Sequence, residues 1–190
     1  MVTESDRNTF ECLALNKRNL GRFAWEFERS VELFEYMGQI DADRRDQYEP
    51  VGTLRPPFGH YQMIAGRDAA LNIYHFYCAI TAVRIQLSRC KSLQGADHRS
   101  VKIARQIFEG QFPHTEHIRN AVAHAGELAE TPGKMMDTMA LGHQLVSSIS
   151  GSIFSVGKEG SVFSVTINKA TTGKLRAIKA RVDDALPMVS

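Results

Sequence analysis

The sequence is poor in cysteine, and its three cysteines follow no paired pattern. Cys12, Cys78 and Cys90 are odd in number, lie far apart and form no C-x-x-C motif. Disulfide-stabilised domains and many zinc sites place their cysteines in pairs at short, regular spacings. We therefore expect free thiols in a reducing cytosol.

Long apolar runs are also missing. The longest, residues 69–83, is interrupted by Asn72 and His75, and it is shorter than the roughly 18 residues that cross a membrane. The chain begins M-V-T-E-S-D-R, without the apolar segment of a secretory signal. These features predict a soluble, cytoplasmic protein with no membrane partner.

The chain has little excess charge of either sign. Its 23 Lys and Arg against 21 Asp and Glu give a formal net charge of +2. A protein that coats nucleic acid by charge alone is strongly basic, so only a local basic cleft is compatible with this sequence. The motifs G-x-S-x-G, Walker A and G-x-G-x-x-G do not occur, which leaves a hydrolase triad and nucleotide binding without support.

The remaining composition is that of an ordinary globular domain. A chain of 190 residues with 43% hydrophobic content is long enough to bury one core. No fixed-period repeat and no low-complexity segment divides it, so we expect a single domain over residues 1–190.

Helical periodicity dominates the first half. A long amphipathic helix is predicted over residues 6–38, because apolar side chains recur every seven residues on one seam. The seam consists of Leu13, Leu20, Phe27 and Phe34, with Phe10, Ala24 and Val31 in the neighbouring row. Lys17 interrupts that row. The seam suits either a dimer contact or, more simply, packing inside the chain.

Residues 39–59 carry clustered charges and three prolines, which predict a loop. A second, buried helix is predicted over residues 60–90, with His75 as a core histidine. Arg67 and Asp68, near its start, form either a structural pair or an extension of a functional cleft. A third helix, capped by Asp97 or Ser100, should run to about Glu109.

The most informative stretch is I-R-N-A-V-A-H-A-G, residues 118–126, within a helix predicted over residues 114–128. Arg119 carries a permanent charge in a planar fork of donors that suits a phosphate. His124 can take up or release a proton near neutral pH. With Asn120 beside the arginine, these side chains are a minimal set for cleaving a phosphodiester without a metal.

The segment Arg119-Asn120-Ala121-Val122-Ala123-His124 resembles the R-N-x-x-x-H form of the Arg-x4-6-His motif of the HEPN superfamily. Those proteins are small, helical and often dimeric, and many are metal-independent endoribonucleases of toxin–antitoxin, phage-defence or RNA-processing systems. The resemblance implies Arg119, Asn120 and His124 as catalytic residues, RNA as substrate, a homodimer formed through the motif helix, and an antitoxin or activator as a further partner. It implies 2′,3′-cyclic phosphate and 5′-hydroxyl product ends.

Helical geometry places these side chains on different sides of the predicted helix. At 3.6 residues per turn, His117, Asn120, His124 and Glu127 share one polar stripe, whereas Arg119 lies about 140° from His124. Either the long arginine wraps around the helix, or two copies of the helix complete the site. His117, Glu127 and Arg67 are the further candidates for RNA contacts.

Two other interpretations stay open for this helix. His114, His117 and His124, with Glu116 or Glu127, have helical spacings that could hold a metal, but neither an H-E-x-x-H motif nor a cysteine supports them. We therefore predict no metal and no cofactor. Alternatively, Asn120 and His124 satisfy each other in a buried polar seam, and the chain is a noncatalytic HEPN-like interaction or RNA-binding module.

The carboxyl-terminal part changes character. A weakly patterned helix is predicted over residues 134–150. Alternating β-branched and polar residues around G-K-E-G then predict a β-hairpin over residues 152–167. A final helix capped by Thr171 or Thr172 should follow, with inward Leu175, Ile178, Val182 and Leu186, and outward Lys174, Arg176, Lys179 and Arg181. That basic face is either solvated or in contact with a phosphate backbone.

The predicted fold is therefore mainly α. It is a HEPN-like bundle of four to five helices with a hairpin–helix extension at residues 151–190.

Overall fold

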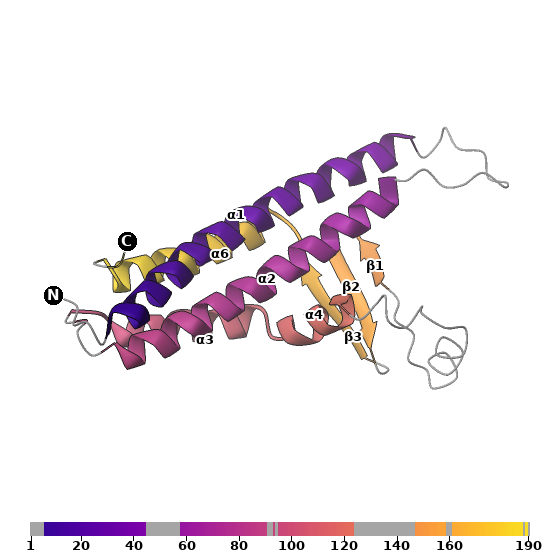
Figure 1. The fold of residues 1–190 in the computed structure, drawn as a ribbon. Helices are drawn as coiled ribbons and strands as arrows, with labels where there is room; N and C mark the ends of the chain where they lie inside the picture. The colour runs from indigo at the N-terminus through magenta and orange to yellow at the C-terminus, as the bar shows by residue number, and fades with distance from the viewer. Residues whose placement is uncertain are drawn as a thin grey trace. The chain divides into compact units, whose positions relative to one another are not determined.

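The computed structural model describes residues 6–44, 58–90, 93, 95–123, 147–158, 161–187 and 189. This part of the chain is mainly helical with one small sheet (Figure 1). The elements in chain order are α1 (Arg7–Arg44), α2 (Phe58–Arg89), α3 (His98–Gln111), α4 (Thr115–Ala123), β1 (Ser147–Ser150), β2 (Ile153–Lys158), β3 (Ser161–Thr166) and α6 (Lys169–Ala185). The predicted fold class, helices with carboxyl-terminal strands and a final helix, is confirmed. None of the described helices combines the length and the hydropathy that a membrane crossing requires.

The chain divides into two compact units, each assembled from segments that are distant in sequence. The first unit comprises Met1–Glu26, Asn72–Pro113 and Ala170–Ser190, and the second comprises Phe27–Leu71 and His114–Lys169. Both α1 and α2 contribute one part to each unit. The single domain expected over residues 1–190 stays a prediction.

The seven-residue spacing of α1 predicts its buried face correctly. Leu13, Leu20 and Phe27 are fully buried and Phe34 is 2% exposed, because side chains seven residues apart return to nearly the same side of a helix. This burial occurs within one chain. The seam is therefore intramolecular core, as the simpler of the two interpretations proposed.

The predicted start of the first loop is wrong. Helix α1 continues through residues 39–44, where the Gln39 amide donates a hydrogen bond to Asp43 Oδ1 one turn later (2.6 Å). Charged side chains are compatible with an exposed helix end, and the first proline of this region is Pro50. Of the rest of the predicted loop, residues 58 and 59 belong to α2, and residues 45–57 lie outside the described residues.

Helix α2 begins and ends within two residues of its prediction, but its buried stripe is narrower than expected. His75 is exposed rather than buried in the core, and its ring lies 5.2 Å from that of Phe23. Two large apolar side chains of this helix, Ile64 and Ile85, are likewise 46% and 43% exposed. An apolar residue does not have to be buried, because folded proteins expose much apolar surface, and this explains the error.

Aromatic rings form the centre of the first unit. Phe76 and Phe108, both buried, stack at 5.7 Å between centroids and join α2 to α3. Helix α3 begins at the predicted cap: Asp97 Oδ1 accepts a hydrogen bond from the Ser100 N–H at 2.9 Å. This bond, together with a second from the Ser100 hydroxyl, lowers the pKa of the Asp97 carboxyl below its ordinary value of 3.8.

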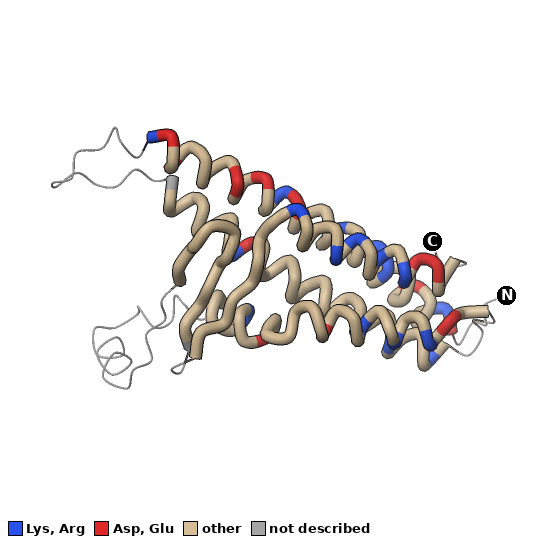
Figure 2. Tube along the Cα trace, turned by 180° about the vertical axis from the view of Figure 1, so that it is seen from behind, with Lys and Arg blue, Asp and Glu red and all other residues tan. Residues whose placement is uncertain are grey.

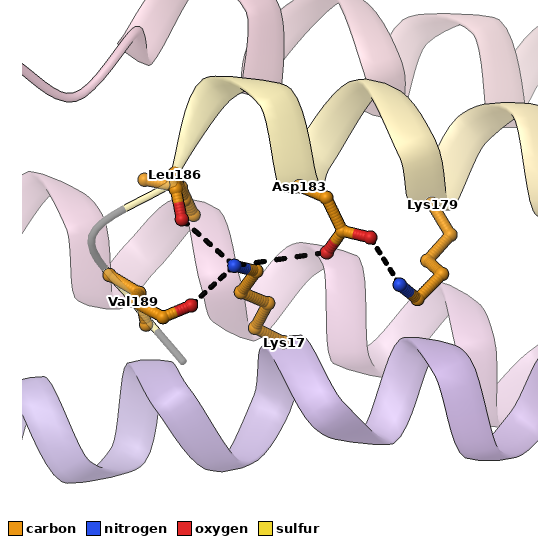
Figure 3. Close-up of polar contacts among 5 residues, drawn as sticks. All are labelled: Lys17, Lys179, Asp183, Leu186 and Val189. Carbon is orange, nitrogen blue, oxygen red and sulfur yellow. Dashed lines mark hydrogen bonds and ion pairs between the residues drawn. The ribbon is translucent and has the colours of Figure 1, made fainter.

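The interruption of the α1 row by Lys17 has a structural reason within the first unit (Figure 3). The Lys17 ammonium donates hydrogen bonds to the backbone oxygens of Leu186, at 2.8 Å, and of Val189. It also lies 3.9 Å from Asp183 Oδ1, and Asp183 pairs with Lys179 one turn earlier. Carbonyls at a helix end have no partner inside the helix, and Lys17 supplies one where the chain leaves α6.

Helix α6 buries the predicted side chains but begins earlier than predicted. Leu175, Ile178, Val182 and Leu186 are 0–2% exposed. Thr171 and Thr172 lie inside the helix, 4% exposed each, and neither is its cap. None of the three cysteines forms a disulfide, as predicted: Cys12 and Cys78 are exposed and Cys90 is buried.

The second unit contains an antiparallel sheet in the order β1-β2-β3. The predicted hairpin is confirmed as β2 and β3, with Phe154 opposite Val165. Residues 147–150, predicted as the end of a helix, instead form β1 and pair with β2. The sequence S-S-I-S has weak local preference, so strand pairing determines its conformation. Residues 134–146 lie outside the described part.

One face of the sheet packs on helices. Phe154 on β2 is fully buried. Its ring is so near Gly66 of α2 that a Cβ added to this glycine would lie 2.8 Å from it. The absence of a side chain at Gly66 therefore allows α2 and β2 to approach closely. Helix α4 contacts both β2 and β3, which brings the motif helix onto this sheet.

Candidate functional site

The candidate site is on α4. This helix is buried along one side, at three positions. Thr115, Ile118 and Ala121 are 7%, 5% and 1% exposed, at the spacing of one side of a helix. The Ile118 N–H donates to the His114 oxygen at 3.0 Å, which closes the first turn. Helix α4 contacts β2 and β3, and these three positions form its buried side.

Arg119 and Asn120 are held together at the edge of this helix. Arg119 Nη1 donates a hydrogen bond to Asn120 Oδ1 at 2.9 Å, and both side chains are half-buried. This bond also assigns the Asn120 amide, since its oxygen must face the guanidinium and its NH₂ group must face away.

The same bond affects how far the Arg119 guanidinium lies from the polar stripe around the helix axis. Successive residues of a helix are about 100° apart, and Asn120 belongs to the stripe that begins at His117. By bonding to Asn120, the Arg119 guanidinium turns towards that stripe. Part of the separation between Arg119 and the polar stripe is thus removed within one copy of the helix.

Three rings cluster beside this pair, two from α4 and one from β3. The His117 ring lies parallel to that of Phe163, with centroids 4.7 Å apart and an interplanar angle of 8°. His114 lies against the same phenylalanine at 5.3 Å and 52°. Both histidines are exposed, whereas Phe163 is half-buried. Sequence reasoning missed Phe163, because its alternation in a strand carried no sign of which helix would cover it.

Comparison with known proteins gives no relative. No family model, no curated protein and no solved structure matches the chain. The site therefore has to be interpreted from its own chemistry.

Arg67 is placed in the second unit as well, but not in the predicted pair. Its neighbour Asp68 accepts a hydrogen bond from the Ser30 hydroxyl on α1 at 2.5 Å. Arg67 Nε is buried without a hydrogen-bond partner in the described structure.

Two predicted site residues, His124 and Glu127, lie outside the described residues. The metal interpretation of the histidines is consequently tested only in part. Within the ranges that the structure describes, no three His, Cys, Asp or Glu side chains gather as a metal site would require. His114 and His117 are neighbours, with ring centroids 6.4 Å apart.

The basic residues of α6 belong to the first unit and not to this site. Figure 2 marks Lys and Arg along the chain and shows several on this helix. Lys174, Arg176 and Arg181 are exposed, as predicted, whereas Lys179 is half-buried in its pair with Asp183. Exposure of this kind fits both predictions, a solvated face and a contact with a phosphate backbone.

Proposed function

We propose that the protein is a metal-independent endoribonuclease that cleaves RNA to 2′,3′-cyclic phosphate and 5′-hydroxyl ends. The observation that carries the proposal is the Arg119–Asn120 hydrogen bond on a half-buried helix edge. A guanidinium restrained in this way is already oriented when a phosphate arrives, and preorganised charge is the main source of electrostatic catalysis. The resemblance of residues 119–124 to the HEPN motif supports the same chemistry.

Each motif residue has a distinct role in the proposed reaction. Arg119 contacts the scissile phosphate and stabilises its developing negative charge. His124 accepts the proton of the ribose 2′-hydroxyl, whose oxygen then attacks phosphorus. The bond to the 5′-oxygen breaks, and that oxygen takes up a proton from a second histidine or from water. Asn120 is a positioning residue, because it acts through the Arg119 guanidinium.

The biological setting is part of the same proposal. A homodimer formed through α4 would bring two copies of the motif together, and an antitoxin or activator would control the activity. Such control suits a toxin–antitoxin or phage-defence system, in which uncontrolled cleavage of RNA would harm the cell.

The variant test uses a labelled single-stranded RNA in excess EDTA. Wild type should cleave it, while Arg119→Ala and His124→Ala should each lose about 100- to 1,000-fold in rate, as for removal of a catalytic charge or donor. Asn120→Ala should lose less, about 5- to 10-fold, the value of one positioning hydrogen bond. Arg84→Ala, which removes an exposed arginine of α2 in the first unit, is the matched control and should cleave normally.

A noncatalytic RNA-binding module is the second candidate. The exposed His117 ring, stacked on the half-buried Phe163 ring, favours it, because aromatic surfaces bind bases without any chemistry. Folded wild type that binds the RNA but does not cleave it would select this candidate.

A further inference from the structure

The rings of His114, His117 and Phe163 form one cluster in the candidate site, and nothing in the proposed cleavage step uses Phe163. Its three centroid distances are 4.7, 5.3 and 6.4 Å. These values fall in the range of direct aromatic contact. Two elements far apart in sequence therefore build one contiguous ring surface.

The orientation of His117 gives this surface an open side. Phe163 covers one face of the imidazole in a nearly parallel stack, yet the histidine is exposed. Because Phe163 packs against one face, the exposed area of the ring lies on its edges and on the opposite face. A planar ring fixed on one side and open on the other suits a second planar group.

Polar groups on the same stripe of α4 indicate which chemical groups a ligand would carry beside its planar ring. Asn120 follows His117 by three residues, and such side chains are neighbours on a helix, about 5–6 Å apart between Cβ atoms. Asn120 turns its NH₂ donors away from Arg119, and Arg119 brings positive charge to the same edge. A ligand with a flat ring and an adjacent phosphate matches this combination, and a nucleotide has both.

We propose that His117 and Phe163 form a base-stacking site that holds one unpaired base of single-stranded RNA beside Arg119. The inference rests on the proposed function, since it places that base next to the phosphate to be cleaved. His114 packs against Phe163 in a tilted contact and keeps the stack in place. Bases in a duplex are already stacked on their neighbours, so the site selects single-stranded over double-stranded RNA.

The test measures binding separately from cleavage. A short fluorescent RNA with 2′-fluoro groups lacks the attacking hydroxyl, so the Kd can be measured by fluorescence anisotropy without turnover. His117→Ala and Phe163→Leu should each weaken binding about 5- to 150-fold, the effect of losing one base–aromatic stack. His117→Phe keeps a ring at this position and should bind within about threefold of wild type.

The chain provides a matched control for the histidine. His75 is also exposed and also lies against a phenylalanine, Phe23, but it belongs to the other compact unit. His75→Ala should leave the Kd unchanged. Circular dichroism of each variant checks that folding is retained, and the conservative Phe163→Leu change keeps an apolar side chain under α4.

The outcomes separate this inference from the proposed function. Equal Kd values for His117→Ala and wild type, or wild type that binds no single-stranded RNA, would overturn the stacking site. Rescue by His117→Phe would support it over a role of the imidazole in proton transfer. Wild type that shows the stacking effects but cleaves no unmodified RNA would retain the site and overturn the nuclease.

Discussion

Replacing Lys17 with Met removes the ammonium group that donates hydrogen bonds to two backbone oxygens just after α6. The Lys17 side chain is only 14% exposed, and its ammonium donates to the Leu186 and Val189 oxygens while facing Asp183. Methionine keeps most of the apolar stem but supplies no donor. Since Val189 is fully buried, water has poor access to the carbonyl that loses its partner.

The magnitude follows from these contacts. A hydrogen bond to a charged group contributes about 1.5–3 kcal/mol. The Leu186 oxygen also accepts from the Val189 N–H at 3.2 Å, so it is not left without a partner. Asp183 is 32% exposed and keeps Lys179, so loss of that ion pair adds at most about 1 kcal/mol. We expect the free energy of unfolding to fall by about 2–4 kcal/mol.

Urea unfolding followed by circular dichroism measures this change. In a protein of this size the expected loss corresponds to a Tm lower by roughly 4–16 °C. Arg7→Met is the matched control, because it breaks an exposed pair with Glu11 on the same helix, with side chains 76% and 62% exposed. The control should change stability by no more than about 0.5 kcal/mol. A Lys17→Met protein as stable as this control would refute the reasoning.

Two further predictions concern stability. Asp97→Asn keeps an oxygen for the Ser100 N–H but removes the charge. Because folding lowers the pKa of the Asp97 carboxyl, wild type should be the more stable protein above pH 3.8. The difference in stability should vanish as the pH falls through the lowered pKa. Thermal unfolding from pH 2 to 7 checks this, and a difference that does not shrink as the pH falls below 3.8 would contradict it. Gly66→Ala should lower the Tm, since the new Cβ meets the buried Phe154 ring at 2.8 Å. Gly173→Ala, with open space around its Cβ, should instead gain up to about 1 kcal/mol from helix propensity, and equal shifts in the two variants would disprove the packing argument.

Sequence patterns predicted correctly those elements whose conformation depends on residues close in the sequence. The seven-residue spacing of α1, the Asp97 cap and the alternation of β2 and β3 each depend on residues within a few turns of one another. Strand β1 was mispredicted as helix, because its conformation comes from pairing with β2 and not from S-S-I-S itself. The role of Lys17 was equally hidden, since its partners lie 169 and 172 residues away.

For the candidate site, too, only features within one helix could be predicted from the sequence. The motif identified Arg119 and Asn120, and the structure adds the hydrogen bond between them. Helical periodicity placed His117 and Asn120 on one polar stripe, and neither is buried, whereas Ile118 and Ala121 are. No periodicity within α4 could identify Phe163, because which strand covers a helix is decided by tertiary packing.

The central claim is that RNA is cut through its own 2′-hydroxyl at a site containing Arg119. The most direct measurement is mass spectrometry of the products from two oligonucleotides of one sequence, one all-ribose and one all-deoxyribose, incubated with wild type in excess EDTA. The account predicts that only the ribose strand is cut, and that its fragments end in 2′,3′-cyclic phosphate and 5′-hydroxyl groups. Cleavage of the deoxyribose strand, or fragments with 3′-hydroxyl and 5′-phosphate ends, would contradict it.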